Sequence, residues 1–182
     1  MSTKGRLRII GGTWRSRIVH FPPAGDLRPT PDRVRETLFN WLGQNLNDKT
    51  CLDLFSGSGA LGFEALSRGA RKVVMVEKNR RAFQALRDNA QKLGAQNLEL
   101  VLADALQFLS VDRNAYHIIF LDPPFRKDNL PGVLALAPQH LAEGGLVYVE
   151  SGKAFDVPGW EVWRHGRAGK VNYQLLKWKQ RE

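Results

Sequence analysis

Residue types that mark secreted, membrane or metal-binding proteins are scarce in this chain of 182 residues. The only cysteine is Cys51, so no internal disulfide can form, and we expect a reducing, cytoplasmic setting. No apolar run is long enough to span a bilayer, and the basic N-terminus lacks the apolar segment of a signal peptide. The four histidines are scattered and form no ligand cluster with the cysteine, so we expect no metal.

Several nucleophile and nucleotide motifs are missing as well. The glycine-rich stretch 56–62 carries no Walker lysine, which argues against a P-loop. Its serines do not fit the pattern G-x-S-x-G and no histidine partner is indicated, which argues against a serine hydrolase. Cys51 lies in an apolar stretch, where a thiol is more often a packing residue than a nucleophile.

Positive charge is present in excess and is unevenly distributed. The net charge is +9 and hydrophobic residues make up 43% of the chain, which indicates one basic globular domain. Residues 1–35 hold eight Lys or Arg and two acids, and residues 160–182 hold six and two. The middle of the chain, 36–159, is nearly neutral, with thirteen Lys or Arg and fourteen acids. Basic ends on a neutral body favour contacts with a phosphate backbone over a merely solvated surface.

The sequence Asp122-Pro123-Pro124-Phe125 follows an apolar run, 118–121, that predicts a buried strand. The two prolines stop the strand and stiffen the turn after it. The turn would present a carboxylate, backbone carbonyls and an aromatic ring at the crevice above a sheet. These groups suit a planar base with an exocyclic amine, since oxygens accept from its N–H groups and the ring stacks on its face. An ordinary strand exit is the alternative, and the tetrapeptide alone does not decide between them.

A glycine-rich turn lies upstream, between a predicted strand, 50–55, and a predicted helix. The three glycines of the stretch 57–62 fit G-x-G-x-x-G, which allows a tight turn and close approach of a ligand to the backbone. The next predicted strand, 72–77, ends in Glu77, 24 residues after Asp53. A carboxylate at that place can hold both hydroxyls of a ribose. Together these features predict a site for a nucleoside-containing cofactor.

The acid before the glycines indicates which cofactor fits. A dinucleotide places its pyrophosphate at the helix N-terminus, whereas here Asp53 lies just before the turn. A carboxylate suits the ammonium and sulfonium groups of S-adenosylmethionine better than it suits a phosphate. The sequence therefore favours methyl transfer over hydride transfer.

On these residues the chain resembles the class I S-adenosylmethionine-dependent methyltransferases. The stretch 53–59 (DLFSGSG) is similar to their motif I, Glu77 to their ribose acid, and 122–125 to the motif of enzymes that methylate exocyclic amines of bases. More narrowly, the stretch 28–40, with RPTPDRVRE and LFN, resembles the bacterial 16S ribosomal RNA guanine-N2 methyltransferases. The resemblance covers nearly the whole chain, from residue 8 to residue 173.

The resemblance implies a site for S-adenosylmethionine and a pocket for a guanine that has been turned out of its stack. The cofactor residues that it implies are Arg28, Thr30, Asp53, Phe55, Ser56, Gly57, Gly59, Glu77, Lys78, Asp104 and Ala105. Among these, the last two would lie beside the adenine, and the first two would close over the cofactor or substrate.

The resemblance assigns catalysis to Asp122, Pro123, Pro124 and Phe125. Phe125 would stack on the base, while the Asp122 carboxylate and the Pro123 carbonyl accept from its N–H groups. Transfer would then be a direct in-line displacement that depends on positioning and electrostatics and needs no covalent intermediate.

The turn-forming residues predict the order of elements. Residues 7–21 predict a β-hairpin around two glycines, and a helix should follow with Thr30 as N-cap and Pro31 at its first position. Strands then alternate with helices up to residue 151, which requires a parallel sheet with right-handed crossovers. Two further predicted strands, 160–164 and 171–178, would form a terminal antiparallel pair. The apolar face expected of the first helix comprises Val34, Leu38, Trp41, Leu42 and Leu46.

We therefore predict an α/β fold of the Rossmann-like class I methyltransferase type. It would have a mostly parallel twisted sheet with helices on both faces, an antiparallel C-terminal strand pair, and an N-terminal β-hairpin plus helix. One domain would span 1–182, with 1–46 as an RNA-contacting extension and 50–182 as the catalytic core. The expected partner is 16S ribosomal RNA or the small ribosomal subunit, with no membrane, and the protein is expected to be a monomer. The candidate RNA contacts are Arg6, Arg8, Trp14, Arg15, Arg17 and Arg33.

Four other functions stay open at this point. The same tetrapeptide serves adenine-N6 and protein-glutamine methylation, and its Asp is compatible with guanine without proving it. A non-catalytic RNA-binding module with a degenerate cofactor fold is disfavoured by the intact glycines, Glu77 and Asp122. A dehydrogenase would leave the tetrapeptide unexplained. Trp14 has a simpler alternative, since it could be a packing residue of the hairpin.

Overall fold

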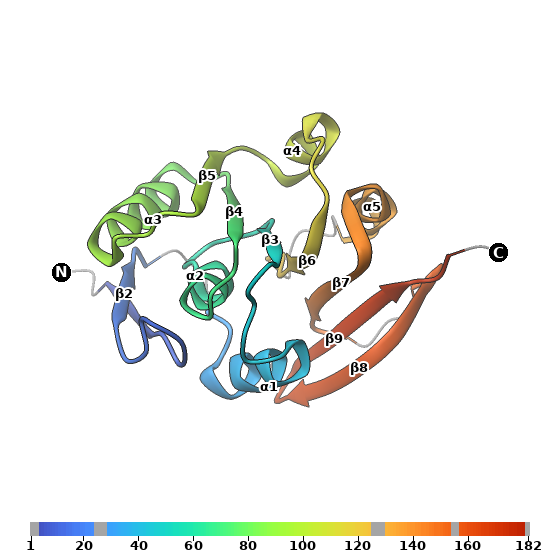
Figure 1. Cartoon of the computed structure of the whole chain (residues 1–182), viewed down its shortest axis with the longest axis horizontal. Helices are drawn as coiled ribbons and strands as arrows, with labels where there is room; N and C mark the ends of the chain where they lie inside the picture. The colour runs from blue at the N-terminus through green and yellow to red at the C-terminus, as the bar shows by residue number, and fades with distance from the viewer. Residues whose placement is uncertain (1–3, 24–28, 125–129, 154–156, 181–182) are drawn as a thin grey trace.

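A seven-stranded sheet with the order β5-β4-β3-β6-β7-β9-β8 forms the centre of the structure (Figure 1). The computed structural model describes residues 4–23, 29–124, 130–153 and 157–180. Five strands of the sheet run parallel, namely β3 (Thr50–Asp53), β4 (Lys72–Glu77), β5 (Leu98–Leu102), β6 (Tyr116–Leu121) and β7 (Leu141–Ser151). The last two, β8 (Trp160–Ala168) and β9 (Val171–Trp178), pair antiparallel with each other, and β9 pairs antiparallel with β7. This confirms the predicted sheet and its antiparallel C-terminal pair.

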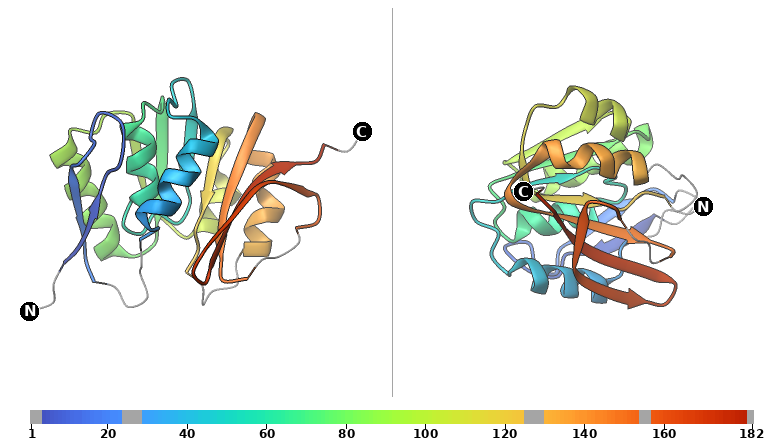
Figure 2. Two further views of the ribbon diagram at one scale, coloured as in Figure 1. Left: turned by 90° about the horizontal axis from the view of Figure 1, so that it is seen from below. Right: turned by 90° about the vertical axis from the view of Figure 1, so that its right-hand side faces the viewer.

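Helices cover both faces of the sheet, as predicted (Figure 2). The helices are α1 (Asp32–Leu42), α2 (Ala60–Ser67) and α3 (Arg80–Leu93) on one face, α4 (Ala105–Val111) and α5 (Leu130–Leu136) on the other, and a 3-10 turn, η1 (Ala137–His140). Successive side chains of the parallel strands point into two separate apolar clusters, because each strand is buried on both faces. No helix among the described residues is long and apolar enough to cross a membrane.

The start of α1 differs from the prediction. The N-cap position is Pro31 and makes no side-chain capping hydrogen bond, so the assignment of Thr30 as N-cap is wrong. Thr30 is 2% exposed, and its hydroxyl instead donates to the carboxylate of Asp122 at 3.3 Å. A buried carboxylate is the stronger acceptor for this hydroxyl, and the contact ties the loop before α1 to the end of β6.

The far end of α1 also differs from the expected helical spacing. The helix stops at Leu42, and Gly43 follows with φ +98°. Leu46 is fully buried, but it reaches the core from the loop after the helix and not from the helical face. Phe39, next to Leu38 on α1, is equally buried and packs against Phe120 of β6 at a ring distance of 6.1 Å.

The predicted hairpin is present as β1 (Gly5–Arg8) and β2 (Ile18–Phe21), which pair antiparallel with Leu7 opposite Val19. Its apolar side chains join the cluster on the α1–α3 face. Asn89 of α3 is 3% exposed and clamps the hairpin by accepting from His20 N at 3.2 Å and donating to His20 O at 2.7 Å. The hairpin therefore shares the core of the body and does not project from it.

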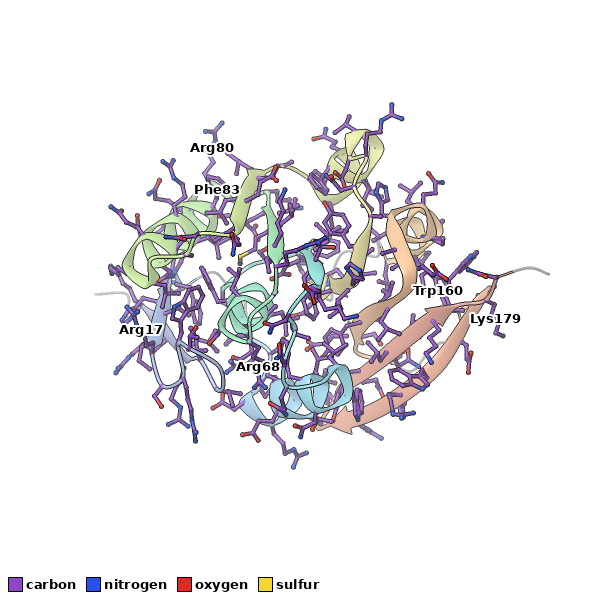
Figure 3. The ribbon with its side chains drawn as sticks, in the orientation of Figure 1. Arg17, Arg68, Arg80, Phe83, Trp160 and Lys179 are labelled. Atoms are coloured by element: carbon purple, nitrogen blue, oxygen red, sulfur yellow. The ribbon has the colours of Figure 1, made fainter. Side chains whose placement is uncertain are left out.

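A buried ionic cluster joins the hairpin, α1 and α2; we call it the Glu64 cluster, after the carboxylate at its centre. Arg35 and Glu64 have fully buried side chains and meet at 3.1 Å, and Arg68 bonds the other Glu64 oxygen at 3.0 Å. The backbone N–H groups of Ile10 and Gly11 also donate to Glu64. Figure 3 labels Arg68 beside α1. The Arg35 guanidinium also donates to the carbonyl oxygens of Thr30 and Arg8 and to the Asp32 carboxylate.

Candidate active site

The strand order reverses between β3 and β6, because the chain first adds β4 and β5 on one side and then crosses to the other. In open α/β sheets, ligands bind outside the carboxyl ends of the strands at such a point. Here the carboxyl ends of β3, β4, β5 and β6 enclose a cavity. Its lining comes from one segment after each strand, namely Leu54, Phe55 and Gly57, then 76–78, 103–105 and 122–124.

Nine of the predicted site residues line this one cavity. They are Phe55, Gly57, Glu77, Lys78, Asp104, Ala105, Asp122, Pro123 and Pro124. Thr30 reaches the site through its hydrogen bond to Asp122. Arg28 and Phe125 lie outside the described residues, so their predicted roles stay predictions. The arrangement brings the glycine-rich turn, the ribose acid and the proline-stiffened turn to one place.

The glycine-rich turn is held by its own backbone. Ser56 Oγ donates to the Asp53 carbonyl at 2.8 Å, and Gly59 N donates to the Ser56 carbonyl at 2.7 Å. Gly59 has φ +85°, and a Cβ there would lie 2.5 Å from the Phe63 ring, so the position requires glycine. Ser56 and Gly59 therefore shape the turn from behind, while Gly57 faces the cavity.

Asp53 lies deeper than predicted. It is 2% exposed, and it is not among the described residues that line the cavity. Its Oδ2 accepts from Gly62 N at 3.0 Å, which fixes the start of α2. Burial raises the pKa of Asp53 to about 7, the Gly62 hydrogen bond opposes this rise, and the charge of Glu77 adds to it. Its predicted role toward the cationic end of a cofactor stays a prediction beside this structural one.

Glu77 lines the cavity, and both of its carboxylate oxygens accept backbone hydrogen bonds. Its Oε2 accepts from Gly57 N at 2.8 Å and its Oε1 accepts from Asn79 N at 2.9 Å. Each carboxylate oxygen has two lone pairs, so each keeps capacity for one further donor. Two hydroxyls of a ribose are such donors, and the residue is half-buried at the cavity wall.

Asp104 caps α4. Its Oδ1 accepts from Leu106 N at 3.0 Å and from Gln107 N at 3.4 Å, and both of these capping bonds use the same oxygen. The cap fixes the turn that brings Ala103 and Ala105 to the cavity wall. This is consistent with a flat, mostly apolar slot for a base at this end of the cavity.

Asp122 is the first residue after β6. In the strand order β5-β4-β3-β6 it lies at the other end of the cavity lining from Asp104, which follows β5. Burial raises its pKa well above the usual range, and the neighbouring charge of Glu150 raises it further. The Thr30 hydroxyl opposes this rise by donating to the carboxylate.

Sequence reasoning missed the buried polar residues behind this site, Glu150 and Tyr148 on β7. Glu150 is 4% exposed, and Tyr148 Oη donates to its Oε1 at 2.7 Å. A signal was available, because the apolar stretch 146–149 ends in an acid just as the stretch before Glu77 does. Arg35 and Glu64 were also missed, and their type gave no hint that two charged side chains would be buried.

The predicted RNA contacts divide into two groups. Arg6, Arg8, Arg15, Arg17 and Arg33 are exposed on the hairpin, its loop and α1. Trp14 is half-buried and packs against the core, and its backbone N donates to Ser67 Oγ at 2.9 Å. This contact favours the packing alternative, and a stacking role for Trp14 stays a prediction. No group of three or more possible metal ligands occurs among the described residues.

Comparison with known proteins agrees with this geometry. A family model described as "Conserved hypothetical protein 95" matches residues 7–177. The "Ribosomal RNA small subunit methyltransferase D" of Escherichia coli is 44% identical over 97% of this chain and 92% of that protein. The protein of the same name from Haemophilus influenzae is 39% identical over 97% and 96%. A solved structure, "Putative methyltransferase yhhF from Escherichia coli", superposes with a TM-score of 0.86 at 40% identity, covering 97% of this chain and 100% of that chain.

Proposed function

The chain belongs to the family described as conserved hypothetical protein 95, and from this we propose that it methylates the exocyclic N2 amine of a guanine in 16S ribosomal RNA of the small subunit. The observation that carries the proposal is the end of β6. There Asp122 and the following prolines line the same cavity as Glu77 and the glycine-rich turn. A base amine and a nucleoside cofactor can therefore meet inside one site.

S-adenosylmethionine fits this lining, and when bound it supplies an electrophilic methyl group. The two Glu77 oxygens offer free acceptor capacity for a ribose, and the Gly57 backbone allows close approach. The Asp122 carboxyl would accept from the amine of the guanine and aim its lone pair at the methyl carbon. The Pro123 carbonyl is the second proposed acceptor. Positioning and electrostatics then supply most of the rate enhancement.

Surface charge supports an RNA substrate. A hollow of about 370 Å³ lies between the hairpin and the start of α1, and it is lined by Arg6, Arg8, Ile18 and residues 29–32. Thr30 belongs to this hollow and also bonds Asp122, so the hollow adjoins the proposed catalytic end. In Figure 3, Arg17 and Lys179 lie at opposite ends of the molecule. A folded RNA can contact both basic ends at once, whereas a free nucleoside cannot.

The C-terminal pair carries a second cationic feature. The Trp163 ring has the Arg164 guanidinium 4.3 Å from its centroid and the Lys177 ammonium 4.0 Å away. Both cations are held in place by the ring, which orders positive charge at this end of the sheet. We further propose that the protein acts in the cytoplasm as a monomer. Sedimentation of the purified protein measures its oligomeric state.

Mapping methylated nucleotides tests the proposal directly. Small-subunit particles from cells that lack this protein are incubated with the purified protein and S-adenosylmethionine. We expect one guanine of 16S ribosomal RNA to gain an N2-methyl group. A gain of N6-methyladenine, or of methylated glutamine in a protein, would replace this proposal by one of the alternatives that share the tetrapeptide.

Cofactor binding gives a second prediction. The protein is expected to bind S-adenosylmethionine or its demethylated product and not NAD, because Asp53 precedes the glycines and Glu77 follows the second strand of the core. Calorimetry with each ligand measures this. Binding of NAD without binding of the sulfonium cofactor would contradict the assignment.

RNA binding is expected to depend on the hairpin arginines. Replacing Arg6, Arg8, Arg15 and Arg17 by glutamine should lower affinity and flatten the salt dependence, by about 0.7 to 0.9 in slope per lost phosphate contact. Affinity for the cofactor should hardly change. The measurement is the dissociation constant for ribosomal RNA at several salt concentrations.

A matched control uses four exposed cations at the amino ends of the parallel strands, on the sheet edge away from the cavity. These are Lys49, Arg71, Lys72 and Arg113. Their replacement by glutamine removes the same charge and should change the slope far less. Equal slopes in the two quadruple variants would show that only net charge matters and that the hairpin is no specific contact.

A further inference from the structure

Two carboxyl groups lie side by side at the carboxyl ends of the neighbouring strands β6 and β7. β6 and β7 run parallel with Leu121 opposite Val149, so Asp122 and Glu150 each follow one residue later. Alternation along the strands puts both side chains on the face that carries Phe120 and Tyr148. The two carboxyl groups are therefore neighbours on one face of the sheet, and the charge of Glu150 is among the causes that raise the pKa of Asp122. Two buried carboxyls held side by side can share one proton.

The two carboxyls differ in what surrounds them. Glu150 is 4% exposed and accepts from Tyr148 Oη at 2.7 Å, so it lies behind the cavity wall. Asp122 lines the cavity and accepts from the Thr30 hydroxyl at 3.3 Å. None of the ion pairs found within the described ranges involves either carboxyl. The Asp122 carboxyl therefore faces the cavity, and the Glu150 carboxyl lies behind it.

The charged surroundings disfavour ionisation of both groups. Burial, the charge of Glu150 and then that of Asp53 raise the pKa of Asp122, and the Thr30 hydroxyl lowers it. Burial and Glu150 raise the pKa of Tyr148, so its hydroxyl keeps its proton and keeps donating. Tyr173 of β9, opposite Glu150 in register, is a further titratable group on this face. Adjacent carboxyls in such a setting hold one proton between them.

We propose that Glu150 is the second carboxyl of the methyl-transfer site: it shares one proton with Asp122 and takes up the charge when the pair accepts the proton that the substrate amine loses. This rests on the proposed function. As the amine nitrogen bonds the methyl carbon, the carbon–sulfur bond breaks and its electron pair stays on sulfur. The nitrogen then loses a proton to Asp122, and the proton already on Asp122 passes to Glu150. The singly charged pair ends neutral and later releases one proton to water.

Titration of the free protein tests this without any substrate. Carboxyl carbons labelled with carbon-13 report protonation by NMR, and the wild-type pair should titrate in two well-separated steps. In Glu150→Gln the upper step should vanish and Asp122 should titrate once, between the two wild-type values. Glu161→Gln, which removes an exposed carboxylate of β8, is the matched control and should leave both steps in place.

Unfolding measures the same coupling in another way. A buried carboxyl with a raised pKa destabilises the folded state as pH rises from the ordinary carboxyl range through the raised value, because the folded state then binds more protons than the unfolded chain. Removing Glu150 should reduce the loss of folding stability that accompanies the rise in pH. The urea midpoint of Glu150→Gln should therefore fall less between pH 5 and pH 9 than that of the wild type.

Kinetics connect the pair to the reaction. Glu150→Gln should lower kcat about 10- to 100-fold near neutral pH, and its pH–rate profile should show one ionisation where the wild type shows two. KM should stay near wild type for the RNA and for the cofactor, because Glu150 does not line the cavity. Tyr148→Phe, which keeps both carboxyls, should keep two steps in the titration.

The outcomes separate this proposal from the proposed function. A single wild-type titration step, or wild-type kcat and an unchanged pH profile in Glu150→Gln, would overturn the shared proton. Failure to methylate guanine with two titration steps intact would instead overturn the substrate assignment and leave the carboxyl pair standing.

Discussion

Asp122→Ala is expected to lower kcat for RNA methylation by at least about 100-fold while the enzyme still binds both substrates. The carboxyl lines the cavity at the end of β6 and would act mostly as the amine approaches the methyl group. Such a loss falls on kcat more than on KM. Single-turnover methylation of small-subunit particles, with separate measurement of cofactor binding, is the experiment.

The Asn variant refines this test. Asp122→Asn keeps the shape and one acceptor oxygen, and burial together with Glu150 already favours the neutral form of Asp122. We therefore expect Asn to keep more activity than Ala and to bind the cofactor normally. Asp88→Ala, at an exposed position of α3, controls for the loss of a carboxylate elsewhere. Near-wild-type turnover by Asp122→Ala would mean that the tetrapeptide is only a strand exit.

Glu77→Ala is expected to weaken S-adenosylmethionine binding by about 2–3 kcal/mol, or about 30- to 150-fold in Kd. The variant would lose the proposed hydrogen bonds to the ribose. It would also free Gly57 N, which now donates to Glu77 at 2.8 Å, so the turn that approaches the cofactor would lose a support. Calorimetry gives the affinity, and circular dichroism confirms that the domain stays folded.

Glu99→Ala is a suitable control for this variant. Glu99 lies on the neighbouring strand β5 and makes an exposed ion pair with Lys72, at 2.9 Å. Its removal should leave cofactor affinity within about twofold of wild type, since exposed pairs contribute at most about 1 kcal/mol to stability. Wild-type affinity in a folded Glu77→Ala protein would remove the ribose assignment.

The order of elements was predictable because it depends on local patterns. The apolar run before Glu77 became β4 with the predicted bounds, 72–77. The cavity was predictable as well, since acids and glycines that follow parallel strands must meet at one edge of the sheet. Sequence reasoning thus brought Glu77 and Asp122 together although they are far apart in the chain.

The errors concern side chains whose partners come from distant segments. Thr30 has the chemistry of an N-cap, but the Asp122 carboxylate competes for its hydroxyl from 92 residues away. The structure adds to the prediction for Asp53, because the Gly62 N–H is a partner that the sequence did not indicate. Glu150 was not predicted at all, because only the register of β6 against β7 sets it beside Asp122. A local sequence pattern cannot indicate such partners, because they are brought near only by the tertiary fold.

The Glu64 cluster limits how parts of this protein can be exchanged with those of its relatives. Glu64 accepts from two N–H groups of the hairpin loop and bonds Arg35 of α1, while its own helix begins at the glycine-rich turn. A hairpin with a different loop backbone would leave this buried carboxylate without two of its donors, which costs several kcal/mol. We therefore expect a working chimera to carry residues 35 and 64 along with the hairpin.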